Sequence, residues 1–216
     1  MQAFTTLTAV AIPIDMVNVD TDQIIPVRFL PNPRTHPDYH TFLFHDLRFD
    51  ADGNLHVPGN LDEWIFIGSS LGMGYSQADF DPDSPGMFQV ARMEPEAYAA
   101  FKATGRFVDG TMIALHFYDS QNEVSINRAG FVMGGLHFAE IHYKDSQRFP
   151  DGFNFYNIEN DAETAREIPL PNECVDCHKR DGAYDGVFVQ FYPDIHRYLP
   201  AGVRERLASA NESGHH

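Results

Sequence analysis

Both cysteines of this sequence lie within one five-residue stretch, Cys174-Val175-Asp176-Cys177-His178. Two thiols at this spacing can add to the two vinyl groups of one porphyrin, and the adjacent imidazole can then bind the iron axially. The motif therefore predicts a covalently bound haem c. Cys174 and Cys177 are the expected thioether anchors, and His178 is the expected proximal ligand of the iron.

Three other interpretations of the two cysteines remain open. A thioredoxin-like redox pair has the same spacing, but it normally begins a helix in a β–α–β unit, and the proline-containing approach at 168–173 does not resemble one. A structural zinc ion needs about four ligands, and the chain has no second cysteine pair. The two thiols can also be buried without any role.

Composition limits the classes of partner. The chain has 216 residues and a net charge of −16, so its surface is strongly acidic. Nucleic acids and anionic membranes both require a basic surface, and we expect neither as a partner. An acidic surface could steer a basic redox partner toward the protein. The high aromatic content, 13%, suits a large apolar pocket but also suits an ordinary β-rich core.

The order of motifs predicts an α+β fold, with an antiparallel β-sheet, packed helices and a c-type haem. We expect a short β-rich N-terminal segment at 1–55, a main domain at 56–200 and a polar tail at 201–216. Helices are expected at 94–105, at 161–167 and at the cysteine motif. Strands are expected at 64–67, 88–93, 111–118, 130–144, 153–156 and 187–193.

Two stretches of the first part stand out: Val19-Asp20-Thr21-Asp22-Gln23-Ile24-Ile25-Pro26 and Phe42-Leu43-Phe44-His45-Asp46-Leu47-Arg48-Phe49. They resemble the N-terminus of the small subunit of isopropylmalate dehydratase. That family continues with a Gly-Ser-Ser-Arg-Glu loop that helps to form the substrate site. Here Gly68-Ser69-Ser70 is followed by Leu71, without the Arg-Glu pair. We therefore interpret residues 1–55 as a remnant or a fusion, and keep a dehydratase-subunit-like protein of leucine biosynthesis as an alternative function.

The second part carries a series of short motifs in a fixed order. They are Pro58, 63–64, 94–98, 102–105, 107–111, 144–149, 174–179 and 187–193. This ordered set resembles the cytochrome P-460 family, which includes the cytochrome c′-beta proteins. The resemblance implies a small antiparallel sheet with packed helices and one c-type haem, usually in a homodimer. It also implies a five-coordinate iron with an open distal face.

The same resemblance implies binding or conversion of small nitrogen-oxide ligands, chiefly nitric oxide and, in some members, hydroxylamine. The hydroxylamine oxidisers link a lysine to the porphyrin from the strand that follows an Asp-Gly-Thr turn. The corresponding strand here, 111–118, contains no lysine. We therefore expect a haem of the c′-beta type without that cross-link, and haem oxidoreductase activity stays an open question.

The resemblance assigns the distal pocket to Phe153, Asn154 and Phe155. The two phenylalanines would exclude water, and the Asn154 amide could donate a hydrogen bond to a bound ligand. Alternation along a strand places Asn154 opposite both phenylalanines, so at most one of these two sets faces the haem. A methionine at the sixth position would instead give an electron-transfer cytochrome. The candidates are Met73, Met87, Met93, Met112 and Met133.

The cellular location has two opposing indications. The family resemblance implies the periplasm. The first twenty residues, however, contain no basic region followed by an apolar run, so no secretory signal is visible and a cytoplasmic location stays possible.

Overall fold

The computed structural model describes residues 19–36, 39–57, 61–74, 81, 84–159 and 164–213. The apolar run at 10–14 and the family residue Pro58 lie outside this part of the chain. The structure divides the chain into two units, Met1–Asp46 and Leu47–His216. The division therefore falls nine residues before the boundary at 55 that the sequence suggested.

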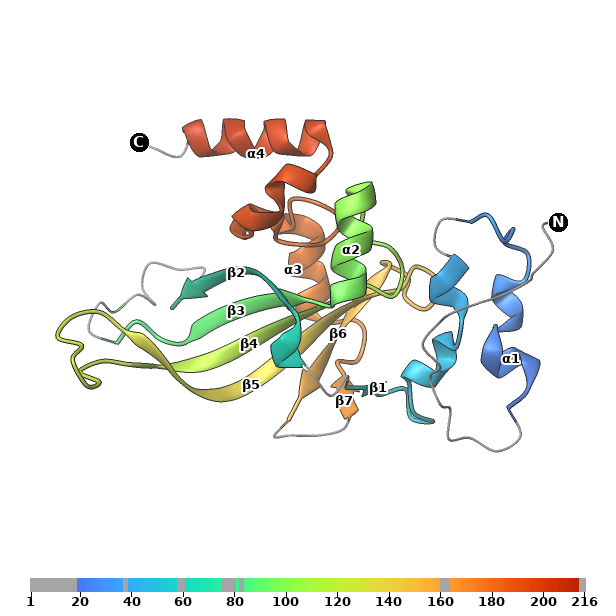
Figure 1. The fold of residues 1–216 in the computed structure, drawn as a ribbon, viewed down its shortest axis with the longest axis horizontal. Coiled ribbons are helices and arrows are strands. Elements are labelled where there is room, and N and C mark those ends of the chain that lie inside the picture. Colours follow the sequence, from blue (N-terminus) through green and yellow to red (C-terminus); the bar gives the residue numbers. More distant parts are fainter. Residues whose placement is uncertain are drawn as a thin grey trace, which may run out of the picture. The chain divides into compact units, whose positions relative to one another are not determined.

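Within the described residues, seven strands form one antiparallel sheet in the order β1-β7-β6-β5-β4-β3-β2 (Figure 1). Successive strands pair with one another from β2 to β7, so the sheet is a meander whose far edge is closed by β1. This arrangement confirms the α+β fold. The strand bounds are β1 Leu55–His56, β2 Ile65–Leu71, β3 Phe88–Met93, β4 Met112–Gln121, β5 Val132–Lys144, β6 Phe153–Ile158 and β7 Thr164–Glu167.

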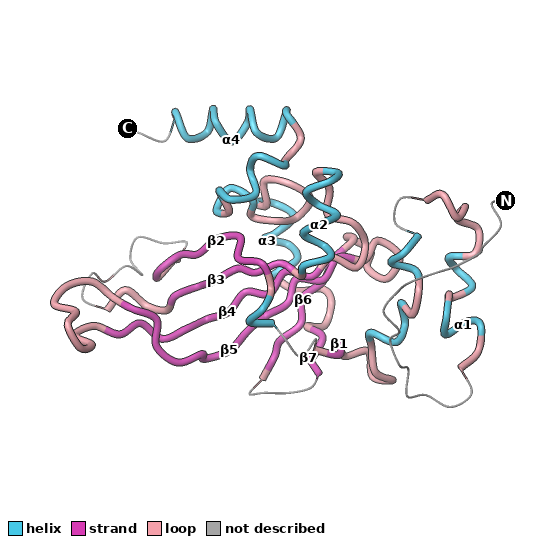
Figure 2. The backbone as a smooth tube through the Cα atoms, viewed as in Figure 1, coloured by secondary structure: helices cyan, strands magenta, loops and turns pink. Residues whose placement is uncertain are grey.

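Helices cover one face of this sheet, as the cyan segments of Figure 2 show. Helix α2 (Pro95–Thr104) connects β3 to β4, and α3 (Glu173–Asp181) follows β7. After them come the 3₁₀ helices η6 (Val189–Phe191) and η7 (Pro193–Tyr198), and then α4 (Ala201–Ser213). None of the described helices is both long enough and apolar enough to cross a bilayer.

Each face of the sheet has its own buried cluster. The helix-covered face packs apolar residues of β2, β3 and β4 against α2, η7 and α4, including Met93, Phe101 and Val203. The opposite face packs Trp64, Tyr143 and other residues into a second cluster. Apolar side chains at alternate strand positions on both faces explain why the strands are recognisable in the sequence.

Helix α2 ends as its sequence predicts. Pro95 occupies the first turn, where its missing N–H costs no hydrogen bond. Gly105 follows the helix with a φ of +69°, and a Cβ at this position would lie 2.7 Å from the Tyr198 carbonyl oxygen. Only glycine combines this left-handed conformation with such a close approach.

The first unit differs from the β-rich segment that its sequence suggested, because its described residues form short helices. They are α1 (Thr21–Ile24), η1 (Val27–Phe29), η2 (Tyr39–Phe42) and the start of η3 (His45–Arg48). Asp20 and Gln23 explain the difference, since each side chain accepts a hydrogen bond from the other residue's backbone N–H and together they form a capping box. Within this unit Phe29 stacks on Phe42 at 4.5 Å.

Three further segments differ from their sequence-based predictions. Residues 164–167, expected to be helical, form strand β7, which pairs with β6 and β1. Residues 189–191, expected to be in a strand, form η6. The expected polar tail from 201 onward forms α4, whose Val203 is buried in the core. Strand β7 depends on pairing with β1, which is distant in the sequence, and α4 depends on the core that Val203 joins.

Candidate functional site

A buried polar network fixes the start of helix α3, which carries the cysteine motif. Asn172 caps the helix by accepting a hydrogen bond from the Val175 N–H at 2.9 Å. The Asn172 amide donates in turn to Asn154 Oδ1 at 3.1 Å. Asn154, which is fully buried, donates to Glu167 Oε1 at 3.0 Å and to the Ile168 carbonyl at 3.1 Å. Strand β6 therefore holds the helix in place through side chains.

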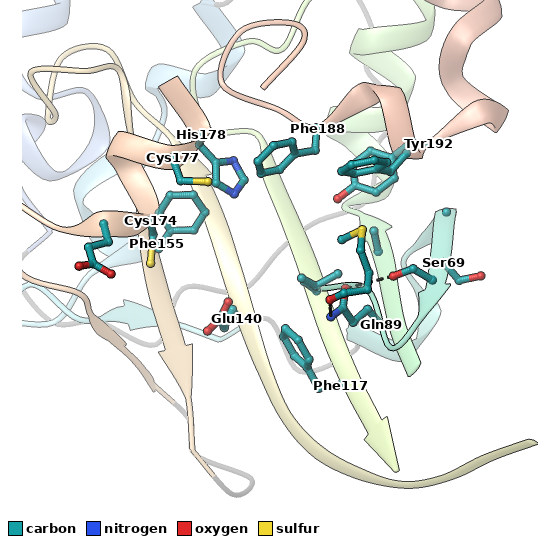
Figure 3. Close-up of a pocket in the computed structure, with 17 residues that line it drawn as sticks. Ser69, Gln89, Phe117, Glu140, Phe155, Cys174, Cys177, His178, Phe188 and Tyr192 are labelled. Carbon is teal, nitrogen blue, oxygen red and sulfur yellow. Dashed lines mark hydrogen bonds between the residues drawn. The ribbon is translucent and has the colours of Figure 1, made fainter. Parts of the chain in front are cut away.

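A cavity of about 480 Å³ lies between α3 and the sheet, which is within the usual range for a cofactor or small-ligand site. Figure 3 shows Cys174, Cys177 and His178 on the helix side of this cavity, and Glu140, Phe117 and Gln89 on the sheet side. Its wall combines the three motif residues with apolar and aromatic side chains. These include Ala91, Leu115, Phe117, Phe155, Phe188 and Phe191.

The surroundings of His178 fix its ring and its tautomer. The Nδ1 atom lies 2.7 Å from the carbonyl oxygen of Gly186. A carbonyl can only accept a hydrogen bond, so Nδ1 carries the proton and the neutral ring keeps a lone pair on Nε2. Burial lowers the pKa of His178, partly offset by this hydrogen bond, and so favours the neutral ring. Phe155 and Phe188 pack on it with ring centroids at 4.6 and 4.3 Å.

The two cysteines are free thiols. Burial raises the pKa of Cys174, and Glu140 raises it further. Burial and the neighbouring Asp181 likewise raise the pKa of Cys177, whose Sγ lies 3.7 Å from Asp181 Oδ2. Redox-active pairs need a lowered thiol pKa, so these acidic surroundings disfavour the thioredoxin-like interpretation.

A structural zinc ion would need a group of protein ligands. The described part of the chain contains no group of three or more His, Cys, Asp or Glu side chains that could hold a metal ion. The cysteine motif therefore lies in a site whose remaining walls are mainly apolar. Such walls suit a large flat organic group better than a bare ion.

The floor of the cavity consists of side chains at alternate positions of neighbouring strands. One cross-strand row contains Gly68, Ala91, Leu115 and Glu140, and the next contains Ser70, Gln89 and Phe117.

Glu140 is a carboxyl group on an otherwise mainly apolar floor. Burial raises its pKa, which favours the protonated form. Between the floor and α3, His142 of β5 stacks against His178 at 5.7 Å between ring centroids. Both ring nitrogens of His142 are buried and have no hydrogen-bond partner. A partly desolvated carboxyl group and a buried imidazole thus lie close to the cysteine motif.

These features fit a haem. Two thiols that can form thioethers and an imidazole with a free Nε2 lone pair line the same aromatic cavity. The hydrogen bond from Nδ1 to a carbonyl is the usual support for a metal-binding histidine. The roles of Cys174, Cys177 and His178 themselves stay predictions, which the tests below address.

The three residues expected in the distal pocket are placed differently from one another. Phe155 lines the cavity beside His178. Phe153 is buried next to it, against the ring of His142 at 4.8 Å, and does not line the cavity. Asn154 points away from both, as strand alternation predicted, and its two amide hydrogens are donated to Glu167 and Ile168. The Asn154 amide therefore donates to protein acceptors, and not to a bound ligand as the sequence suggested.

The structure also sorts the five candidate methionines. Met73 lines the cavity, whereas Met93 and Met112 are buried in the two core clusters and Met133 is half exposed. Met87 is half-buried just before β3 and does not line the cavity. Among the described residues that line the cavity there is no lysine, which agrees with the absence of lysine from strand β4.

Sequence analysis did not identify Glu140, His142, Phe188 or Gly186 as parts of the site. Alternation along β5 places Glu140 and His142 on one face, but the sequence alone does not indicate which face meets α3. Gly186 acts through its backbone carbonyl, for which no side-chain signal exists.

Comparisons with known proteins match the two parts of the chain separately. The family model of cytochrome P460 matches residues 58–189, more than half of the chain. The small subunit of 3-isopropylmalate dehydratase from Jannaschia sp. (strain CCS1) is 40% identical over 84 residues, which cover 36% of this chain and 41% of that protein. The corresponding subunit from Caulobacter vibrioides (strain NA1000 / CB15N) is 50% identical over 84 residues with the same coverage. The chain therefore spans about two fifths of the length of these curated relatives.

Proposed function

Because this chain belongs to the cytochrome P460 family, we propose that it is a c-type haem protein that binds nitric oxide or a related small nitrogen compound. The observation that carries this proposal is the cavity wall that combines two free thiols with an imidazole whose Nε2 keeps its lone pair. These three groups match the requirements of covalent attachment and axial ligation.

A bound haem would supply an iron centre that could bind a small ligand. Cys174 and Cys177 would hold it through thioethers, and His178 Nε2 would donate to the metal. Phe155 and Phe188 would keep the His178 ring in place, and Leu115 and Phe117 would exclude water from the floor. A dry cavity strengthens each electrostatic interaction with the ligand.

Absorption spectroscopy tests this proposal directly. The protein, produced together with a c-type haem maturation system, is expected to show a Soret band and a c-type pyridine haemochrome. Addition of nitric oxide to the reduced protein is expected to shift the Soret band. A colourless protein, or haem that acidified solvent extracts, would overturn the proposal.

The Glu140 carboxyl lines the cavity proposed to hold the haem, and burial raises its pKa. The carboxyl of Glu140 ionises more readily in the unfolded chain than in the folded protein. The unfolded state is therefore favoured as the pH rises through the folded-state pKa of Glu140. At low pH, where the carboxyl is protonated in both states, burial carries no such cost. We therefore expect Glu140→Gln to unfold at higher denaturant concentration than the wild type at pH 7, with a smaller difference at pH 4.

The matched control for this prediction is Glu173→Gln, because Glu173 also borders the cavity but is exposed in the first turn of α3. Loss of its favourable interaction with the helix N-terminus should cost about 0.5 kcal/mol. The control should therefore shift in the opposite direction at pH 7. Equal behaviour of the two variants would contradict the placement of Glu140 on a desolvated floor.

The dehydratase similarity supports a second candidate function, association with a large iron–sulfur subunit. The similarity covers about two fifths of each relative, and Ser70 is followed by Leu71-Gly72 in place of the Arg-Glu pair. Co-purification with such a large subunit would support this candidate. A periplasmic location, a homodimer and a basic redox partner stay predictions.

A further inference from the structure

The segment that follows α3 makes a tight turn directly beneath His178. Tyr184 and Val187 form an antiparallel bridge, and the two residues between them, Asp185 and Gly186, have φ values of +53° and +71°. Positive φ at both central positions is the geometry of a type I′ turn, for which Asp-Gly is a preferred sequence. This turn presents the Gly186 carbonyl to His178 Nδ1.

Packing against β6 limits where this carbonyl can lie. A Cβ added to Gly186 would clash with Phe153 Cε1 and would lie 2.7 Å from Phe153 Cζ. The Gly186 backbone is therefore in direct contact with the edge of a buried ring. Phe153 also packs against His142, and His142 in turn stacks on His178, so the turn contacts the group of sheet residues beside the His178 ring.

An ion pair connects the same turn to the end of β5. Lys144 Nζ lies 3.0 Å from Asp185 Oδ1, and the Lys144 side chain is only 14% exposed. A partly desolvated pair of this kind is stronger and less sensitive to salt than one on the open surface. Asp185 directly precedes Gly186, whose carbonyl accepts the hydrogen bond from His178 Nδ1. The ion pair therefore restrains that carbonyl.

We propose that the Tyr184–Val187 turn is a positioning element for His178, with Lys144, Asp185 and Gly186 as its positioning residues. The Lys144–Asp185 pair and the Phe153 contact hold the Gly186 carbonyl 2.7 Å from Nδ1, and this keeps the proton on Nδ1 and the lone pair on Nε2. The turn thereby sets the donor strength of the imidazole toward a metal. This inference deepens the proposed function and rests on His178 being the axial ligand.

The variant Asp185→Asn tests this inference without disturbing the turn, because Asn-Gly is also a preferred type I′ sequence. In the wild-type apoprotein, ¹⁵N NMR of labelled histidine should show His178 with protonated Nδ1 and unprotonated Nε2. In Asp185→Asn the population ratio of the Nε2-protonated tautomer to the Nδ1-protonated tautomer should rise. The rise should reach about fivefold if the hydrogen bond is lost. Lys144→Met should produce the same change.

The chain offers a matched control in the second ion pair that joins α3 to the β5–β6 region. Lys179 Nζ lies 2.6 Å from Asp151 Oδ1, and the Asp151 side chain is about as exposed as that of Asp185, 33% against 38%. Asp151→Asn removes the ion-pair partner of Lys179, which directly follows His178 in the sequence, but leaves the turn intact. It should therefore leave the His178 tautomer unchanged.

A second readout uses the haem-loaded protein. A weaker Nδ1 hydrogen bond makes the imidazole a weaker donor, so the iron–histidine stretching frequency of the reduced protein should fall in Asp185→Asn and not in Asp151→Asn. An Nε2-protonated His178 in the wild-type apoprotein, or identical behaviour of the two variants in both readouts, would overturn the inference. Failure of haem attachment would overturn the proposed function alone, because the tautomer is measured without haem.

Discussion

Replacement of both Cys174 and Cys177 by alanine is expected to abolish covalent haem attachment. The two thiols are free and line the same cavity as His178, so each is available to form a thioether with a porphyrin vinyl group. The expected result is the complete loss of haem staining on a denaturing gel. Mass spectrometry should show the unmodified mass for the double variant and one added haem for the wild type.

Single replacements separate the two anchors, and a variant of the residue between them serves as the control. Either Cys174→Ala or Cys177→Ala should leave at most one thioether and a haemochrome band shifted from the two-thioether position. Asp176→Ala alters an exposed side chain on the same helix turn and should retain full attachment. Haem that stays bound to the denatured double variant would show that the cysteines are not the anchors.

Replacement of Asn154 by alanine is expected to destabilise the second unit by about 2–3 kcal/mol, because it removes three buried hydrogen bonds. For a unit of this size the melting temperature should fall by roughly 5–10 °C. Asn172→Ala removes the helix cap in the same network and should cost about 1 kcal/mol. Calorimetry or thermal circular dichroism measures both effects.

Asn157→Ala is the matched control for Asn154→Ala, since Asn157 lies on the same strand but is exposed. It should change the melting temperature by less than about 2 °C. The same variants distinguish the observed network from a distal role. If Asn154 donated to a bound nitric oxide, its replacement would shift the N–O stretching frequency with little loss of stability. We expect the reverse, a large loss of stability and an unchanged N–O stretch.

Elements with local signals were predicted well from the sequence. The cysteine motif was expected on a short helix and lies on α3, between the Asn172 cap and Asp181. Helix α2 has proline in its first turn and Gly105 after its last. Strands β3, β4 and β5 follow alternating apolar patterns, and Gly134 and Gly135 lie where the β4–β5 register shifts.

Elements that depend on distant partners were predicted poorly. Strand β7 is only four residues long and exists because β6 and β1 pair with it. Residues 189–191 contain good strand formers, yet they form the 3₁₀ helix η6. There, Gln190 donates to the Asp181 carbonyl and accepts from the Ala183 N–H, which ties this segment to the end of α3. Side-chain hydrogen bonds of this kind outweigh intrinsic β-propensity.

The sequence by itself determined the chemistry of the motif, because thiol spacing and an adjacent imidazole are properties of five consecutive residues. It also determined the fold class, since periodicity is a local property of each segment. Only the tertiary structure decided which side chains surround that motif. Glu140 on β5, Phe188 after α3 and the Gly186 carbonyl converge on one cavity because sheet register and a tight turn bring them together. Such convergence depends on contacts between distant segments, for which the residues themselves carry no individual signal.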